Sequence, residues 1–268
     1  MSLVTCHPPP LLSGMSCKIE VLFAPAEFRA LRRDDLAKTT CVVFDVLRAT
    51  STMVTALANG AAALIPVEEI SEAIALRREQ PDALLAGERD GLRIGSTLTG
   101  GIEFDLGNSP REFTREKVHG RTIISTTTNG TRALRACVGA ETVLIGSFLN
   151  LSATRDFIIR SKPLHLLLVC AGTNEKAALE DTLAAGALCD GIIAAWPSVD
   201  FLDSANIAFR VFRHAQSDLP AAIQAAQNAR RLLANAQLRD DVEFCLHRDS
   251  QPVAAVMDSN GLIKGHRS

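Results

Sequence analysis

The sequence predicts an α/β fold with a largely parallel or mixed sheet and helices on both faces. Short apolar runs alternate with amphipathic segments along most of the chain, as expected for strands joined by crossover helices. The chain has 268 residues, of which 47% are hydrophobic, and can bury a large core as one α/β domain or as two lobes that meet near residues 115–125. Residues 1–16 contain a proline run and are expected to form a loose N-terminal tail before the folded part, residues 17–268.

Four strands with helices between them are expected in the first half of the chain. The expected strands are short apolar runs at residues 17–23, 41–44, 64–67 and 83–86. The expected helices cover residues 25–36, 50–59 and 70–78, and Gly60 ends the second of them. Residues 90–111 are rich in Gly, Ser, Thr and Asn, which predicts a long loop or a small excursion of the chain.

The second half repeats the alternation. Strands are expected at residues 121–125, 142–146 and 164–170, and helices at residues 132–138 and 151–160. A further helix includes Glu180 and Asp181, and helices dominate from residue 183 to about residue 236. A late strand is expected at residues 242–246.

The junction between the second strand and its helix is the most informative segment. Asp45, Arg48, Thr50 and Ser51 follow directly on an apolar run. The first amides of a helix lack intrahelical partners and attract anions, while an arginine can clamp a phosphate and a carboxylate can hold a divalent cation. The structural alternative is that Asp45 and Thr50 only cap the helix.

Other polar clusters also follow expected strands. Ligands of parallel sheets gather beyond the carboxyl ends of the strands, and this rule groups Asp45 with Glu88, residues 126–129 and residues 172–181. Each cluster also has a structural interpretation. Glu88 and Arg89 could form an exposed turn pair, and residues 126–131 a capped turn. Glu180 and Asp181 could only compensate a helix dipole, and Asn108 and Ser109 could only start a turn. Cys170 is expected to be inert packing rather than a nucleophile.

Several classes of function are disfavoured. A net charge of −2 without a basic stripe argues against nucleic-acid or membrane partners. Seven scattered cysteines favour reduced thiols in a cytoplasmic protein, and the histidines show no zinc spacing. The phosphate-binding Gly-x-x-x-x-Gly-Lys-Ser/Thr loop, the dinucleotide Gly-x-Gly-x-x-Gly turn and the Gly-x-Ser-x-Gly elbow are absent. The remaining carboxylates, hydroxyls and basic groups suit Mg²⁺-assisted chemistry on a small anionic phosphate ester.

The polar motifs together resemble the 2-phosphosulfolactate phosphatase (ComB-type) family. The resemblance covers roughly residues 17–244 and rests on five segments in order, which are Asp45-Val46-Leu47-Arg48-Ala49-Thr50-Ser51-Thr52, Gly87-Glu88-Arg89, Leu106-Gly107-Asn108-Ser109-Pro110, Thr127-Thr128-Asn129-Gly130-Thr131, and Cys170-Ala171-Gly172 with Leu179-Glu180-Asp181 behind it. It implies a Mg²⁺-dependent phosphatase that hydrolyses 2-phosphosulfolactate to sulfolactate and inorganic phosphate, a step of coenzyme M biosynthesis in methanogens. It also implies an α/β fold of the family's own.

Roles carried over from the resemblance form a hypothesis about individual residues. Catalysis is assigned to Asp45, Arg48 and Glu88. Mg²⁺ is assigned to Asp45 and Asp181, with Glu88 or Glu180 assisting. Phosphate or substrate binding is assigned to Thr50, Ser51, Arg89, Asn108, Thr127, Thr128, Asn129 and Lys176. The nucleophile is either a metal-activated water or Asp45 itself through an aspartyl phosphate.

Two alternatives to this substrate stay open. Residues 96–104 and 174–176 differ from the family pattern, so the enzyme would act on another small phosphate ester if they reshape the organic half of the pocket. A catalytically silent module that binds a phosphorylated metabolite is the other alternative, but four acids beside an anion favour a cation and catalysis. A homodimer is expected only because most soluble oligomers are two-fold.

Overall fold

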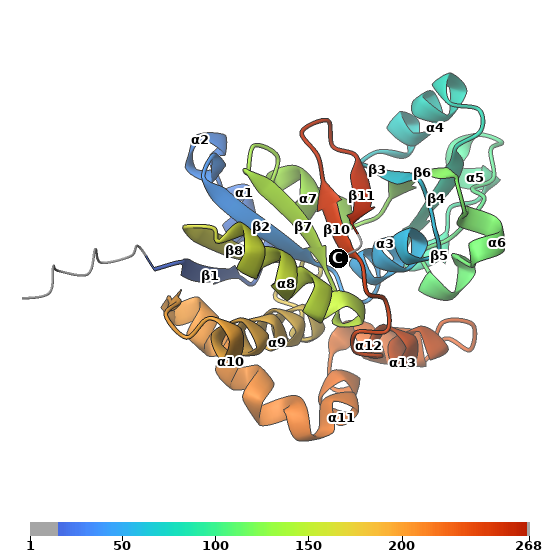
Figure 1. Cartoon of the computed structure of the whole chain (residues 1–268). Helices are drawn as coiled ribbons and strands as arrows, with labels where there is room; N and C mark the ends of the chain where they lie inside the picture. Colours follow the sequence, from blue (N-terminus) through green and yellow to red (C-terminus); the bar gives the residue numbers. More distant parts are fainter. Residues whose placement is uncertain (1–15, 267–268) are drawn as a thin grey trace, which may run out of the picture.

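The polypeptide forms an α/β structure around one open, mixed sheet (Figure 1). The computed structural model describes residues 16–266, so the predicted N-terminal tail lies outside the described residues apart from its last residue. The sheet is not closed into a barrel, and helices cover both faces, as predicted. Within the described residues no helix is long and apolar enough to span a membrane.

The strands are short and most follow apolar runs. Their bounds are β1 Lys18–Leu22, β2 Thr39–Phe44, β3 Ala63–Val67, β4 Leu84–Arg89, β5 Leu92–Arg93, β6 Thr122–Thr126, β7 Thr142–Gly146, β8 His165–Cys170, β9 Asp200–Phe201, β10 Ala254–Met257 and β11 Ile263–His266.

The helices lie between the strands and then accumulate near the C-terminus. In the first half they are α1 Pro25–Arg29, α2 Arg33–Leu36, α3 Ala49–Ala58, α4 Ile70–Glu79, α5 Ser96–Thr99, α6 Arg115–Val118 and α7 Gly130–Ala136, with the 3₁₀ helix η1 Pro110–Glu112. In the second half they are α8 Leu151–Ser161, α9 Leu179–Ala195, α10 Asp203–Ala215, α11 Leu219–Gln224, α12 Gln227–Leu233 and α13 Asp240–Cys245, with the 3₁₀ helices η2 Phe148–Asn150 and η3 Gln216–Asp218.

The strand order is β5-β4-β6-β3-β11-β10-β7-β2-β8-β1-β9. Two parallel groups, β4-β6-β3 and β7-β2-β8-β1, are joined by the antiparallel hairpin β10–β11. Six steps separate β2 from β4, and a twist of about 20–25° per step accumulates to roughly 120–150°. Three successive antiparallel pairings separate β3 from β7, so the two groups run in opposite directions. A rotation that approaches a half-turn therefore brings their carboxyl ends toward a common region, where the polar pocket described below lies.

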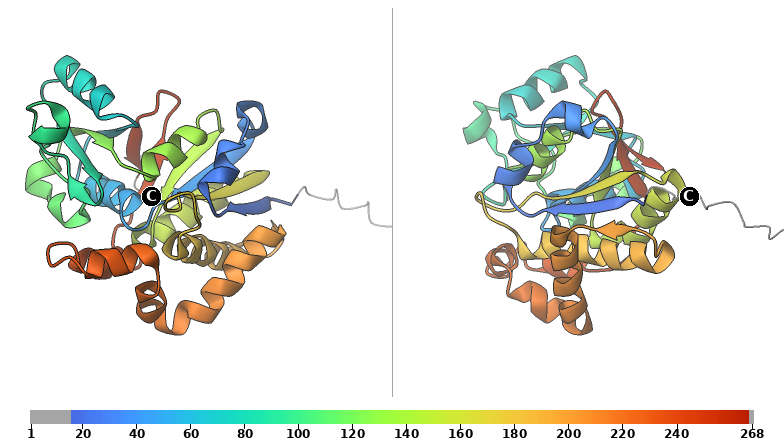
Figure 2. Two further views of the ribbon diagram at one scale, coloured as in Figure 1. Left: turned by 180° about the vertical axis from the view of Figure 1, so that it is seen from behind. Right: turned by 90° about the vertical axis from the view of Figure 1, so that its left-hand side faces the viewer.

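Side chains alternate between the two faces of the sheet. Val42 and Phe44 of β2 pack with α8 to α13, whereas Cys41 and Val43 pack with α1, α2, α3 and α7. Figure 2 shows α9 and α10 side by side along one face, with α11, α12 and α13 beyond them. A smaller cluster packs α4 against β3, β4 and β6. The buried alternation explains why the strands read as nearly continuous apolar runs.

Two predicted elements differ from the structure, and one hairpin was not predicted. Residues 242–246 are not a strand, because residues 242–245 belong to α13 and Leu246 is its C-cap. The first turn of α13 holds Asp240, Asp241 and Glu243 at the positive end of the helix. The expected helix 25–36 is divided into α1 and α2, because Arg32 has an extended backbone. The hairpin β10–β11 was not predicted, since the polar residues of β11 carry little strand signal.

Candidate active site

A polar pocket lies where β2, β4, β6 and β8 end. It brings together six residues that the sequence had selected, which are Asp45, Arg48, Glu88, Asn108, Thr128 and Asn129. They come from segments that are far apart in the sequence, and all but the exposed Thr128 are buried or half-buried at the pocket wall. The rule that ligands gather beyond the carboxyl ends of strands therefore selected residues that share one pocket.

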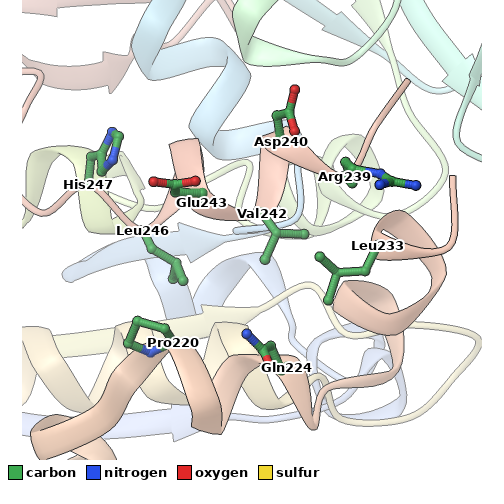
Figure 3. A pocket seen from close by; sticks show the side chains of 9 residues that line it. All are labelled: Pro220, Gln224, Leu233, Arg239, Asp240, Val242, Glu243, Leu246 and His247. Atoms are coloured by element: carbon green, nitrogen blue, oxygen red, sulfur yellow. The ribbon is translucent and has the colours of Figure 1, made fainter. Parts of the chain in front are cut away.

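A second pocket, with a volume of about 530 Å³, lies between α11, α12 and α13 (Figure 3). Its wall is mainly apolar, and Leu233, Val242 and Leu246 face it. None of the predicted site residues lines this second pocket. Phosphate-ester chemistry needs convergent polar groups, so we assign the candidate active site to the polar pocket.

Asp45 occupies the turn between β2 and α3. Its Oδ1 accepts a hydrogen bond of 3.2 Å from the amide of Ala49, and its own amide donates to Thr50 Oγ1 at 3.0 Å. Gly130, the first residue of α7, lies so close that an added Cβ would be 2.9 Å from Asp45 Oδ2. Burial, together with the carboxylates of Glu88 and Glu180, raises the pKa of Asp45 to about 7.

Two acids of α9 are buried beside Asp45. Asp181 accepts hydrogen bonds from the amides of Val46 (2.8 Å) and Gly172 (3.1 Å), and so ties the turn after β2 to the turn after β8. Glu180 Oε1 accepts a hydrogen bond from Asn228, but Oε2 is buried without a partner among the described residues. Burial raises the pKa of both carboxyls, and the nearby acids raise that of Asp181 further.

Glu88 connects the ends of β4 and β6. Its Oε1 accepts hydrogen bonds from the amide and the hydroxyl of Thr128 (2.9 and 2.8 Å), and its Oε2 accepts one from the amide of Gly91 (2.7 Å). These contacts fix the pocket wall opposite α9, and they use both carboxylate oxygens.

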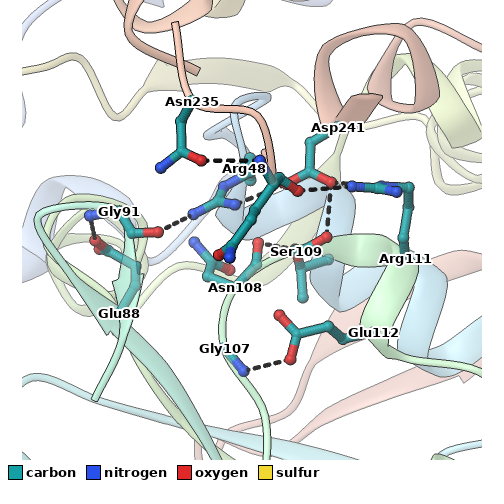
Figure 4. Close-up of polar contacts among 12 residues, drawn as sticks. Arg48, Glu88, Gly91, Gly107, Asn108, Ser109, Arg111, Glu112, Asn235 and Asp241 are labelled. Atoms are coloured by element: carbon teal, nitrogen blue, oxygen red, sulfur yellow. Dashed lines mark hydrogen bonds and ion pairs between the residues drawn. The ribbon is translucent and has the colours of Figure 1, made fainter. Parts of the chain in front are cut away.

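Arg48 is buried in the pocket wall and is held from two sides (Figure 4). Its Nη1 donates to Asp241 Oδ2 and its Nη2 donates to the carbonyl of Gly91, each at 2.7 Å. The other oxygen of Asp241 accepts hydrogen bonds from Ser109 and Arg111 at 2.6 and 2.8 Å. A guanidinium carries five donors, so Arg48 keeps N–H groups for a ligand while its plane is fixed.

Comparison with known proteins decides the family. The model of the 2-phosphosulpholactate phosphatase family matches residues 27–260. The chain belongs to the 2-phosphosulfolactate phosphatase family. It is an enzyme of the phosphoric monoester hydrolase class, and the predicted resemblance is confirmed.

Three relatives illustrate how far the similarity to the family extends. Each is named probable 2-phosphosulfolactate phosphatase. The protein of Caldicellulosiruptor saccharolyticus is 40% identical over 229 residues, which cover 84% of this chain and 91% of the relative. The protein of Thermotoga petrophila is 42% identical over 210 residues, which cover 78% of this chain and 85% of the relative. The protein of Caldanaerobacter subterraneus is 36% identical over 239 residues, which cover 88% of this chain and 95% of the relative.

Some predicted substrate-binding residues of this phosphatase lie outside the pocket wall. Thr50 and Ser51 are buried and bond to the backbone of the β2–α3 turn. Thr127 is a buried helix-start residue whose Oγ1 accepts from the amide of Thr131. Arg89 donates to the carbonyls of Glu88 and Glu68 and to Thr126, and Lys176 is exposed in a tight turn. The structure thus gives the first three a positioning role in the turns and leaves Arg89 and Lys176 away from the pocket.

The first backbone amides of α3 already have hydrogen-bond acceptors within the protein. The amide of Ala49 donates to the side chain of Asp45, and the amide of Thr50 donates to its carbonyl at 2.9 Å. By contrast, the side chain of Asn129 makes no capping bond and lines the pocket together with Asn108. Arg48 and the side-chain amides of Asn108 and Asn129 are therefore among the donors that this family member presents to an anion.

Three residues of the candidate site were not selected from the sequence. Asp241 was placed ahead of a strand, Asn228 lies in the helical region, and Arg231 lines the pocket from α12. All three sit on late helices whose docking cannot be read from local pattern. The only local signal was the pair Asp240-Asp241 after a helix-rich region.

The carboxylates of this phosphatase fit a divalent cation. Within residues 16–266 no group of three or more His, Cys, Asp or Glu side chains is arranged to ligate a metal. Mg²⁺ commonly uses one or two protein carboxylates and completes its shell with water and substrate oxygens. Glu180 and Asp45 match that requirement. The Oε2 atom of Glu180 is buried without a hydrogen-bond partner among the described residues, and burial raises the pKa of Asp45. Within that part of the chain neither carboxylate is balanced by an ion pair.

The described cysteines do not take part in this site. Cys170, at the end of β8, is fully buried, and burial raises its thiol pKa well above the ordinary value. A thiol of this kind is inert packing rather than a nucleophile.

Proposed function

We propose that this protein is a Mg²⁺-dependent phosphatase that hydrolyses 2-phosphosulfolactate to sulfolactate and inorganic phosphate. Membership of the family and the names of its relatives support the substrate. The structural observation that carries the proposal is the buried group of Asp45, Glu180 and Asp181 next to a pocket that also presents Arg48. Such a group is costly unless a cation compensates it.

Asp45 and Glu180 are the residues that would hold Mg²⁺. Both oxygens of Asp181 already accept backbone amides, so Asp181 supports the two turns beside them. When bound, the cation supplies charge neutralisation for the phosphoryl group and lowers the pKa of bound water.

The chain's own donors bind and orient the phosphate ester. Arg48, held by Asp241, directs its remaining N–H groups at the phosphoryl oxygens, and the side-chain amides of Asn108 and Asn129 add neutral donors. In the transition state the charge spreads over the equatorial phosphoryl oxygens, and donors fixed in advance stabilise it without reorganisation. The nucleophile is Asp45, through an aspartyl phosphate, or a water molecule in the pocket.

A rapid acid quench distinguishes the two nucleophiles by whether the protein retains phosphate label. With Asp45 as nucleophile, wild-type protein mixed with labelled substrate retains acid-stable, hydroxylamine-sensitive label. With water as nucleophile, no label stays on the protein while phosphate is released at the same rate.

Phosphate release from a panel of esters tests the substrate. We expect release from 2-phosphosulfolactate to exceed release from phosphoglycolate and from simple sugar phosphates. A preference for another ester would retain the chemistry and replace the substrate. Binding of the esters without any release would instead show a metabolite-binding module, and would overturn the proposal.

A further inference from the structure

Two guanidinium groups line the active-site pocket, those of Arg48 and Arg231. Arg48 is 3% exposed and its charge is balanced by Asp241, which is 0% exposed. Both of its terminal nitrogens already have protein partners. The pocket thus has one guanidinium whose charge is neutralised and whose plane is fixed.

Arg231, unlike Arg48, is neither buried nor held by a counter-ion in an ion pair among the described residues. It is exposed on α12, and its side chain makes no hydrogen bond or ion pair within the described part of the chain. Its positive charge attracts the carboxylate of Glu180 and so lowers the pKa of that group against the effect of burial. An exposed arginine is ordinarily a solvated side chain, but this one borders a pocket whose other charged residues are acids and the neutralised Arg48.

The helix that carries Arg231 is anchored to the active site. Asn228, three positions earlier on α12, is buried and donates to Glu180 Oε1 at 2.7 Å and to Thr173 Oγ1 at 2.6 Å. Side chains three positions apart lie on the same face of a helix. Asn228 therefore fixes the face of α12 that points at the site, while the side chain of Arg231 stays free to meet a ligand.

We infer that Arg231 is a specificity-determining residue that binds a second anionic group of the phosphate ester, a carboxylate or a sulfonate. The inference rests on the proposed function and extends it to the substrate class of acid-bearing phosphate esters. Arg48 and its neighbours take the phosphoryl group, and the planar fork of Arg231 suits the paired oxygens of the other acid. Of the substrate-binding residues suggested by the sequence, Arg89 and Lys176 do not line the pocket, whereas Asn108 does and contributes a neutral amide.

Binding of sulfolactate, which carries both acid groups and no phosphate, tests the inference without catalysis. Calorimetric titration of full-length protein is expected to give at least tenfold weaker binding for Arg231→Gln than for wild type, and partial recovery for Arg231→Lys. Arg230→Gln is the matched control, because Arg230 is exposed on the same helix and donates only to the carbonyl of Ala225. Equal binding by wild type and Arg231→Gln, or no binding of sulfolactate by wild type, would overturn the inference.

A kinetic comparison separates this inference from the proposed function. The ratio of kcat/KM for 2-phosphosulfolactate to kcat/KM for ethyl phosphate is expected to fall at least tenfold in Arg231→Gln. An equal loss for both esters would show a general structural or catalytic role and contradict the inference. If wild type releases phosphate from no ester, the proposed function fails, and the sulfolactate titration still decides the role of Arg231.

Discussion

Arg48 donates a 2.7 Å hydrogen bond from Nη1 to Oδ2 of Asp241, a residue 193 positions later in the chain. Arg48 ends the turn after β2, and Asp241 begins α13. Both side chains are buried, so the first active-site turn is complete only when one of the last helices docks against it. The active site therefore depends on the docking of α13, a helix near the end of the chain, as well as on the sheet.

Replacing Asp241 tests this dependence. Asp241→Asn leaves the charge of Arg48 buried without its counter-ion, and removing one partner of a buried pair costs about 3–5 kcal/mol. We expect a lower free energy of unfolding in a denaturant titration, together with reduced kcat/KM, because the guanidinium is no longer held. The neighbour Asp240 is 64% exposed and, among residues 16–266, forms an ion pair with Arg111 alone, so Asp240→Asn should change stability by less than about 1 kcal/mol. Similar effects of the two variants would contradict the positioning role.

Gly130 tests the packing of α7 against Asp45. A Cβ at this position would lie 2.7 Å from Ala49 Cβ and 2.9 Å from Asp45 Oδ2, so Gly130→Ala must displace the catalytic turn. Overpacking of this kind costs about 1–3 kcal/mol, and we expect phosphate release to fall as well. In Gly191→Ala, within α9, the new Cβ would meet only Arg155 Cδ at 3.4 Å. That control should be neutral or slightly stabilising in thermal unfolding, and an unchanged Gly130→Ala enzyme would refute the close approach.

The buried acids predict how the stability of the metal-free protein depends on pH. Burial and neighbouring carboxylates raise the pKa of Asp45 from 3.8 to about 7. A carboxyl with a raised pKa stabilises the folded state fully below its unfolded value, and this stabilisation is lost as the pH rises through the folded value. In chelator, the Tm should therefore fall as the pH rises from 4 toward and beyond 7, with Asp181 and Glu180 acting in the same direction.

The matched variant is Asp45→Asn, which should flatten this pH dependence, since one of the coupled acids no longer titrates. Added Mg²⁺ should raise the Tm of wild type more at pH 8 than at pH 5. About 1 kcal/mol moves the Tm of a domain of this size by roughly 2–4 °C, so both changes are measurable. A Tm in chelator that rises steadily from pH 5 to pH 8 would show that the acids are compensated by other groups.

Glu180→Gln separates metal binding from a structural role. The amide can still accept the hydrogen bond from Asn228, and it removes a buried charge whose Oε2 has no partner in the described chain. We expect the variant to be as stable as wild type or more stable in chelator at pH 8, and to lose most of the stabilisation by Mg²⁺. A purely structural Glu180 would instead leave the variant less stable in chelator and its response to Mg²⁺ intact.

Much of the fold was predictable because buried parallel strands consist of consecutive apolar residues. The segments around Val42, Ile123 and Leu167 were recognised in this way, and the polar residues after them share one pocket. The strand β11 was not predictable, because its partners β3 and β10 supply its hydrogen bonds and its own residues after Ile263 are exposed. Residues 242–246 show the opposite case, where a short apolar run fits a strand and a helix equally well.

The site was predictable to the extent that it follows strand ends. Asp45 and Asn129 follow strands and Glu88 lies near the end of β4, so the strand ends, turned toward one another by the twist of the sheet, bring these residues together. Asp241 and Arg231 lie on helices whose positions depend on tertiary packing. The pair Asp240-Asp241 was the only local signal for the first, and no local pattern marks Arg231. Arg89 is the converse case, because it neighbours Glu88 in the sequence but does not line the pocket, and adjacent side chains of a strand point to opposite faces.

Phosphate release from 2-phosphosulfolactate, with saturating Mg²⁺ and with chelator, by wild type and Asp45→Asn tests the central claim most directly. We predict release by wild type that chelator abolishes and added Mg²⁺ restores, and a loss of about 10²–10³-fold or more in Asp45→Asn. Asp156→Asn, at an exposed ion pair on α8, should release phosphate like wild type. Full release in chelator, or near-normal release by Asp45→Asn at saturating Mg²⁺, would contradict a Mg²⁺-dependent reaction at the Asp45 pocket.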